Sequence, residues 1–467
     1  MKMGNFWESD VWGTFSLIAV LLLSLLVANG LKKTVGFLRA SLIPTSVLGG
    51  IILLVIASVY KGITCVTLFN TAFFGGDGVW MLEKITYHAL ALGFIATALK
   101  TSDKKFTKER SKEVFNTGVT TVSTYLLQAI FGLGITLIAS LIVSDFFSAA
   151  GVLLPFGYGQ GTGQALNYGT IYETEHGFDG GASFGLTVAA LGFLSASIGG
   201  VIHLNIIKKK RKLSPSLGME ENIELDQVQG KEEIPMNGSM DKLTVQIALI
   251  AVSYILTYLL MYGLGLLLPG LKSVLFGFNF LFGVLIATLV KTVLNLLKKK
   301  SVVKKQYTNN FLLDRVGNCC FDIMVVAGIA AIQIDLIKQY WAILLILGVV
   351  GLVITYAYNL FVAKVLFKDY EDEQFLMMYG MLTGTASTGI ILLRELDGDF
   401  KTPAADNLVY QNFPAIVFGF PMMLLATLAP TQPILTFGIL VAFFVVMNLI
   451  LFRSKIFKRK KPSTTEE

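Results

Sequence analysis

The chain has 467 residues, of which 54% are hydrophobic and only 15% are charged, and its mean hydropathy is +0.68. About a quarter of the residues in a soluble domain are charged, so this composition excludes a soluble protein. It predicts an all-α polytopic membrane protein. The formal net charge is +7, but the basic residues lie in short segments between apolar runs. That pattern concerns orientation in a bilayer and excludes a nucleic-acid partner.

Apolar runs long enough to span a bilayer occur along the whole chain. In the first half they lie near residues 13–31, 41–60, 82–99, 117–144 and 181–207. In the second half they lie near residues 243–268, 273–297, 317–335, 340–366, 408–429 and 432–452. The first run has no basic segment before it and no small-residue cleavage site after it, so we expect a retained span.

Two further apolar segments, 148–172 and 376–394, are interrupted by glycine and share a motif. Residues 158–165 read YGQGTGQA and residues 379–386 read YGMLTGTA, so both copies fit Y-G-x-x-T-G-x-A. Glycine disfavours a helix interior by roughly 1 kcal/mol relative to Ala. In a bilayer, broken backbone is tolerated only where protein or a wet cavity surrounds it, and paired breaks in two halves indicate the binding site of a secondary transporter.

The basic clusters predict the topology, because cytoplasmic loops are enriched in Lys and Arg. Clusters follow residues 31, 99, 207, 297 and 452, and all of them can be cytoplasmic together. The span 117–144 then runs outward and the span 181–207 runs inward, so 148–172 must enter from outside and return. The same reasoning makes 376–394 enter from the cytoplasm, with the N-terminus outside and the C-terminus inside.

These directions predict two inverted-topology repeats of about five spans each, with a glycine-rich re-entrant loop in each repeat. We expect an N-terminal membrane repeat at 1–207 and a polar cytoplasmic linker at 208–241. A C-terminal membrane repeat at 242–430 follows. Residues 431–467 add an extra transmembrane helix and a basic cytoplasmic tail.

Three local signatures resemble the bacterial sodium/glutamate symporters. Ile43-Pro44 with Gly49-Gly50, the G-Q-G-T-G of residues 159–163, and Gly317-Asn318 are similar to family motifs. The family's histidine in the first loop is Gln160 here, and the second loop is poorer in Gly and Pro. The resemblance implies sodium-coupled uptake of L-glutamate or a similar carboxylate, a homodimer in the bacterial inner membrane, and elevator-type alternating access.

The two loops supply the expected binding groups, because free carbonyls and hydroxyls suit sodium and half-helix N-termini suit a carboxylate. The predicted substrate-binding residues are Gln160, Gly161, Thr162, Gly163, Gln164, Thr383, Gly384, Thr385, Ser387, Thr388 and Arg394. The predicted sodium ligands are Thr162, Asn167, Thr383 and Asp322. Asp322 stands in an apolar span, where a carboxylate is costly without a function, although a structural pairing with Arg315 is the alternative.

Other function classes fit less well. The chain lacks a P-loop, a zinc-like Cys/His cluster and a Gly-x-Ser-x-Gly motif, so we expect neither an ATP-driven pump nor an enzyme, and no cofactor. Gly157-Tyr158-Gly159 is similar to a potassium filter, but Pro155-Phe156 precedes it. A carrier that uses protons, or one for another amino or dicarboxylic acid, stays open because of Gln160 and Asp322.

Overall fold

The computed structural model describes residues 5–101, 107–211, 233–236, 240–398 and 400–456. Every named element in these ranges is a helix, and the β contact found there is a bridge between Glu233 and Gln306. The predicted all-helical class is therefore confirmed. Most of the predicted linker 208–241 and the end of the predicted basic tail lie outside the described residues.

The first half consists of α-helices with a few short 3-10 helices between them. They are α1 (Ser9–Thr34), α2 (Gly36–Ala40), α3 (Thr45–Thr64), η1 (Leu68–Asn70), η2 (Ala72–Phe74), α4 (Gly78–Leu99), α5 (Lys108–Ile142), η3 (Ser148–Val152), α6 (Leu153–His176) and α7 (Gly181–Arg211).

The second half begins with α9 (Lys242–Leu267), η4 (Pro269–Leu271), α10 (Lys272–Gly277), α11 (Asn279–Lys299) and α12 (Asn310–Ala330). It continues with α13 (Ile334–Ile337), η5 (Lys338–Tyr340), α14 (Trp341–Leu366), η6 (Lys368–Tyr370), α15 (Glu371–Thr383) and α16 (Ala386–Arg394). It ends with α17 (Ala404–Tyr410), α18 (Asn412–Leu428), α19 (Pro433–Leu451) and α20 (Arg453–Ile456).

Within the described residues, eight helices are long and apolar enough to cross a membrane, or nine if the bent pair α17–α18 counts as one span. The predicted spans over α4 and α12 are not among them. These two helices pack against each other inside the bundle, and protein neighbours can surround their polar residues. A multi-pass membrane protein is thus established.

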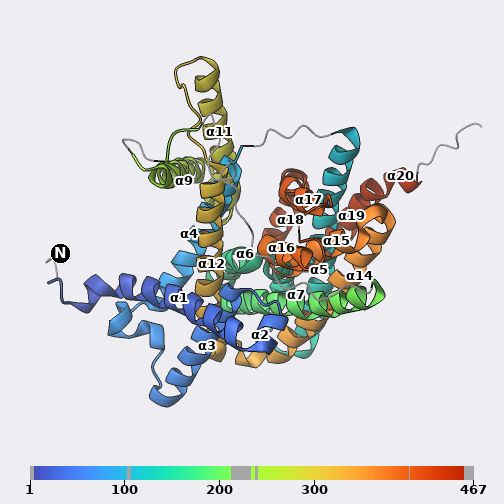
Figure 1. Ribbon diagram of the computed structural model, residues 1–467. Helices are drawn as coiled ribbons and strands as arrows, with labels where there is room; N and C mark the ends of the chain where they lie inside the picture. The colour runs from blue at the N-terminus through green and yellow to red at the C-terminus, as the bar shows by residue number, and fades with distance from the viewer. Residues whose placement is uncertain (1–4, 102–106, 212–232, 237–239, 399, 457–467) are drawn as a thin grey trace, which may run out of the picture.

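The helices form two lobes, which Figure 1 shows at its left and right. The first lobe contains α1, α3, α4, α9, α11 and α12. The second lobe contains α5, α6, α7 and α14 to α19. Helix α6 lies between them, because it packs on α7 in its own lobe and also contacts α4 and α12.

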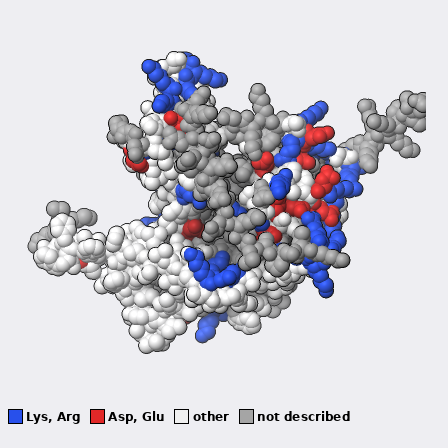
Figure 2. Space-filling view, in the orientation of Figure 1, with Lys and Arg blue, Asp and Glu red and all other residues white. Residues whose placement is uncertain are grey.

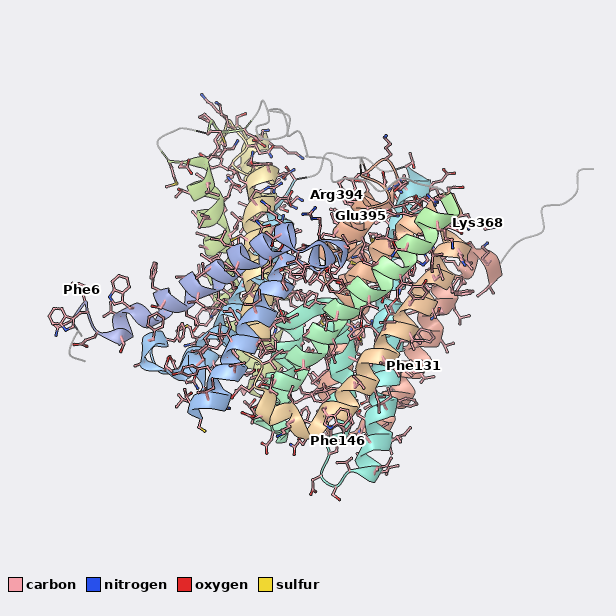
Figure 3. All side chains as sticks on the ribbon, turned by 60° about the horizontal axis from the view of Figure 1, so that its bottom comes forward. Phe6, Phe131, Phe146, Lys368, Arg394 and Glu395 are labelled. Atoms are coloured by element: carbon pink, nitrogen blue, oxygen red, sulfur yellow. The ribbon has the colours of Figure 1, made fainter. Side chains whose placement is uncertain are left out.

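Charged side chains gather at one end of the molecule. Figure 2 shows Lys and Arg at the tip of the hairpin that follows α11, and mixed charges on the second lobe near α20. Figure 3 places Arg394, Glu395 and Lys368 toward the same end and Phe146 at the opposite end. An ion pair of 2.9 Å between Lys208 Nζ and Glu395 Oε2 joins α7 to the segment after α16.

The described end of the linker is attached to the first lobe. Lys242 Nζ, fully buried, lies 2.7 Å from Glu233 Oε2, and the Asn309 side chain donates to the same oxygen at 2.7 Å. Residues 233–236 are therefore held against the segment before α12, although the sequence suggested only a tether.

Candidate functional site

The two copies of the motif both break their helices. Inside α6, Gly161 has φ 78° and ψ −169°, a conformation that is essentially restricted to glycine. Helix α15 ends at Thr383 and α16 begins at Ala386, with Gly384 at φ −144° and ψ −108° between them. The breaks predicted from the glycine spacing are present.

The two breaks lie against each other. A Cβ built on Gly161 would be 3.6 Å from Cγ2 of Thr385 and 3.9 Å from the carbonyl oxygen of Gly384. The two copies of the motif, which begin 221 residues apart at Tyr158 and Tyr379, therefore meet in space.

Helix α5 holds the carbonyls that the breaks release. The Tyr125 hydroxyl donates to the Gly159 carbonyl at 3.0 Å, on the first copy. The Gln128 side-chain amide donates to the Leu382 carbonyl at 2.9 Å, on the second copy, and to the Thr355 hydroxyl at 2.8 Å. Because a buried carbonyl needs a donor, these two side chains stabilise both breaks from one helix.

Helix α7 forms a shared wall behind the breaks. A Cβ on its Gly192 would lie 2.6 Å from the Thr383 carbonyl oxygen and 3.1 Å from the Tyr158 ring. Only a residue without a side chain lets both copies approach α7 so closely.

An open cavity with about 1070 Å³ of empty space, part of it solvent, lies in front of the breaks. Its polar lining residues come from both lobes: Thr97, Thr121, Tyr125, Gln160, Gln164, Thr385, Ser387, Gln411 and Asn412. Of the described residues that line it, none is Asp, Glu, Lys, Arg or His. We call it the inner cavity.

A third helix break contributes to this cavity. Helices α17 and α18 meet at Gln411 with a bend of 50°. The Gln411 side-chain amide donates to the Asn412 side-chain oxygen at 3.0 Å, and the Thr121 hydroxyl donates to the Gln411 side-chain oxygen at 2.9 Å. Helices α16 and α18 thus both have their N-termini at the cavity. Because helix N-termini attract anionic groups, the cavity suits an anion.

Five of the predicted substrate residues line the inner cavity: Gln160, Gln164, Gly384, Thr385 and Ser387. The side-chain nitrogens of Gln160 and Gln164 are buried and find no hydrogen-bond partner among the described residues. Since a buried donor without an acceptor is unfavourable, both amides are available to a ligand.

The other predicted loop residues are packed behind the cavity surface. Thr162 is fully buried, and its hydroxyl donates to the Met324 carbonyl at 3.3 Å. Thr383 donates to the Tyr379 carbonyl at 2.6 Å, and Thr388 donates its backbone N–H to the Thr385 hydroxyl at 3.4 Å. Gly163 faces Leu90 of α4.

Three predicted residues lie away from the cavity lining. Asn167 donates to the Gln164 side chain at 3.3 Å and to the Gly277 carbonyl at 3.1 Å. Asp322 stands on the exposed side of α12. The Arg394 guanidinium lies 5.4 Å from the centroid of the Phe400 ring.

Sequence reasoning missed five polar cavity residues: Thr97, Thr121, Tyr125, Gln411 and Asn412. All five lie within or beside apolar runs, which is the signal that could have identified them. Within the described residues, no group of three or more His, Cys, Asp or Glu could hold a metal ion, so a cation here would depend on carbonyls, hydroxyls and amides.

Comparison with known proteins gives one family. The sequence model of the sodium/glutamate symporter family matches residues 11–389, which is well over half of the chain. The match ends inside α16 and leaves α17 to α20 uncovered. No curated protein matches the chain.

Proposed function

Because the chain belongs to the sodium/glutamate symporter family, we propose that it takes up L-glutamate together with sodium at the inner cavity. The observation that carries this proposal is the meeting of both motif breaks at an uncharged cavity with unpaired amide donors. Membership of the family suggests sodium-coupled glutamate transport in a membrane. A symporter is a transporter, which agrees with the expectation that the chain is not an enzyme.

We propose that the substrate carboxylates are held without a basic side chain in the cavity. The N-termini of α16 and of the part of α6 after Gly161 present backbone N–H groups and the positive ends of helix dipoles. The Gln160 and Gln164 amides add donors, and Ser387 and Thr385 add hydroxyls. Arg394 is then an interfacial residue that neutralises the substrate only from a distance.

For sodium, we propose the Thr162 and Thr383 hydroxyls and the carbonyls near the two breaks. Sodium is a hard cation that prefers oxygen ligands, and both hydroxyls already lie at the motif's equivalent positions. Asp322 would act at the cytoplasmic approach and not as a direct ligand. One sodium entering across 100 mV releases about 2.3 kcal/mol per charge, which offsets the electrical cost of importing a monoanion.

The inverted repeat is supported by matching helix partners. Helix α3 packs on α12 as α4 packs on α11, and α1 packs on α3 as α9 packs on α11. These pairs correspond if 1–207 and 242–430 are repeats of opposite direction. In this scheme η3 and α6 form the re-entrant loop from outside, α15 and α16 form the loop from the cytoplasm, and α19 is the extra helix.

We further propose elevator-type movement of the second lobe, which carries both motif copies, against the first lobe. The first lobe would form the homodimer in the bacterial inner membrane, with the N-terminus outside and the C-terminus in the cytoplasm. The lobes meet mainly through α6, which supports a division at that surface.

The test is uptake of labelled L-glutamate into proteoliposomes under an imposed sodium or proton gradient, with ionophore-collapsed vesicles as the control. Accumulation that requires the sodium gradient is the expected result. Accumulation driven only by the proton gradient would contradict sodium coupling. Transport of another amino or dicarboxylic acid, with no glutamate uptake, would overturn the assignment of the cargo.

A further inference from the structure

A second cavity lies at the other end of the α4–α6 contact. It is open to solvent and has about 860 Å³ of empty space, part of it solvent. Helices α4, α6 and α10 line it with residues that include Trp80, Glu83, His88, Asn167 and Thr170. In the proposed topology, the N-terminus of α4 is external, so we call this the outer cavity.

Two helices, α4 and α6, and the junction between α10 and α11 border both cavities at the same level. On α4, His88 lines the outer cavity and Leu90 the inner cavity. On α6, Gln164 lines the inner cavity and Asn167 the outer cavity, roughly 4.5 Å apart along the axis. On the third side, Gly277 of α10 lines the outer cavity and Phe280 of α11 lines the inner one.

The contacts at this level close the space between the cavities. The Asn167 side-chain amide donates to the Gln164 side-chain oxygen at 3.3 Å and to the Gly277 carbonyl at 3.1 Å, which ties α6 to the end of α10. A Cβ on Gly163 would be only 2.8 Å from Cδ1 of Leu90. Leu90 is therefore pressed onto the α6 backbone beside that hydrogen bond.

The neighbouring turn of α4 is fixed to the same junction. The Asn279 side chain donates to the Tyr87 carbonyl at 3.0 Å, and the Tyr87 hydroxyl donates to the Phe276 carbonyl at 2.8 Å. The α10–α11 junction thus bonds to α4 and α6 together. A displacement of α6 would break the Asn167 bond to the Gly277 carbonyl, whereas the Asn167–Gln164 bond lies within α6 and the bonds to Tyr87 stay in the first lobe.

We propose that Leu90 and Asn167 form the barrier that separates the outer cavity from the substrate site. This inference rests on the proposed transport function and assigns Asn167 a gating role in place of the sodium-ligand role predicted from the sequence. The barrier is one helical turn thick, so a small movement of α6 along α4 connects the two cavities. Cargo from the outside then reaches Gln164 directly after it passes Asn167.

The experiment uses thiol labelling, which does not require transport. Cys65, Cys319 and Cys320 line neither cavity and are replaced by Ser. Ser387→Cys then reports on the inner cavity and Thr170→Cys on the outer one. A membrane-impermeant maleimide is added from outside to cells without sodium or glutamate.

We expect Thr170→Cys to react from outside and Ser387→Cys to react slowly. Combining Leu90→Ala with Asn167→Ala should raise the outside labelling of Ser387→Cys about tenfold or more, since it removes a buried leucine side chain and the tie to α10. Leu92→Ala, an equal truncation on the side of α4 that packs toward Ile95 and Ile250, is the matched control and should leave labelling unchanged.

A restoring variant distinguishes a leak from misfolding. Adding Gly163→Ala to the Leu90→Ala/Asn167→Ala protein places a methyl group where the Leu90 side chain ended and 3.0 Å from the position of its Cβ, so the two residues stay in tight contact and Ser387→Cys labelling should fall again. Unchanged labelling of Thr170→Cys shows that the outer cavity is intact. Slow Ser387→Cys labelling in the Leu90→Ala/Asn167→Ala protein, with normal Thr170→Cys labelling, overturns the barrier.

The result is separable from the identity of the cargo. If glutamate is not transported but the labelling changes as expected, the barrier stands and the substrate assignment fails. If glutamate is transported and the labelling does not change, the barrier fails alone.

Discussion

Gln128 is expected to be essential for transport although it touches no cargo. Its side-chain amide satisfies the Leu382 carbonyl at 2.9 Å, where α15 ends and the helix offers no further N–H donor. Replacing Gln128 by Leu leaves this buried carbonyl unpaired, which costs about 1–3 kcal/mol. If the Gln128 hydrogen bond keeps the second break in its binding geometry, its loss lowers the fraction of protein that can bind cargo by about 5–150-fold.

Thr355→Val supplies the matched control. It removes the 2.8 Å bond between Gln128 and the Thr355 hydroxyl but keeps the bond to Leu382. Its expected cost is about 0.5–1.5 kcal/mol, which is the usual net contribution of one neutral hydrogen bond. Both side chains are fully buried in the α5–α14 contact, so the two variants disturb the same environment.

The assay is the initial rate of sodium-driven glutamate uptake in proteoliposomes with equal amounts of inserted protein, together with thermal stability in detergent. We expect Gln128→Leu to lose far more uptake than Thr355→Val. Equal losses in the two variants, or wild-type uptake by Gln128→Leu, would refute the view that α5 supports the second break.

Three other substitutions test separate parts of the structure. Gly161→Ala forces a side chain into a glycine-only conformation at a cost of about 1–3 kcal/mol, so uptake should fall while the protein stays inserted; normal uptake would mean that the break is not needed. Asp322→Asn should change the sodium activation curve of uptake, and an identical curve would leave Asp322 without a part in coupling. At Asp397, burial alone would raise the pKa, but hydrogen bonds from Thr402 and from the Lys401 backbone lower it below its ordinary value. A lowered pKa stabilises the folded loop above the unfolded value of about 3.9, and this stabilisation is lost as the pH falls through the folded pKa. Asp397→Asn should therefore speed proteolysis after α16 at pH 7, and the difference from the wild type should persist at pH 5 and disappear only at a pH well below 4, once the carboxyl is protonated in the folded protein; a difference that has already vanished at pH 5 would contradict the assignment.

The all-helical fold class and the two helix breaks of the motif could be predicted from the sequence because each has a local cause. Long apolar runs require helices in a bilayer, and the glycines at 161 and 384 weaken the helices that contain them. The helix breaks at Phe278 and Gln411 were not predicted, although Gly277 and Asn279 flank the first and Asn412 and Pro414 follow the second, because no repeated motif marks them. Their positions depend on contacts with α4, α6 and α5, which are remote in the chain.

Both predicted loops reach the inner cavity, but only some of the predicted side chains face it. Glycine at 161 interrupts the helical period, so the sequence cannot tell which of Gln160 and Thr162 faces the cavity. The structure turns Gln160 to the cavity and packs Thr162 against Gly328 of α12. Polar residues on α5 and at the start of α18 were overlooked because nothing in the sequence relates them to the motif.

Gly192 links the evolution of the two motif copies, because both pack against it. Tyr158 and Thr383 are encoded far apart, yet both rest on this one glycine of α7. A side chain at residue 192 would have to be accommodated in both copies at once, so mutations that reshape one copy are constrained by the other. If the halves arose by duplication, they could diverge in their outer helices but not independently at this wall.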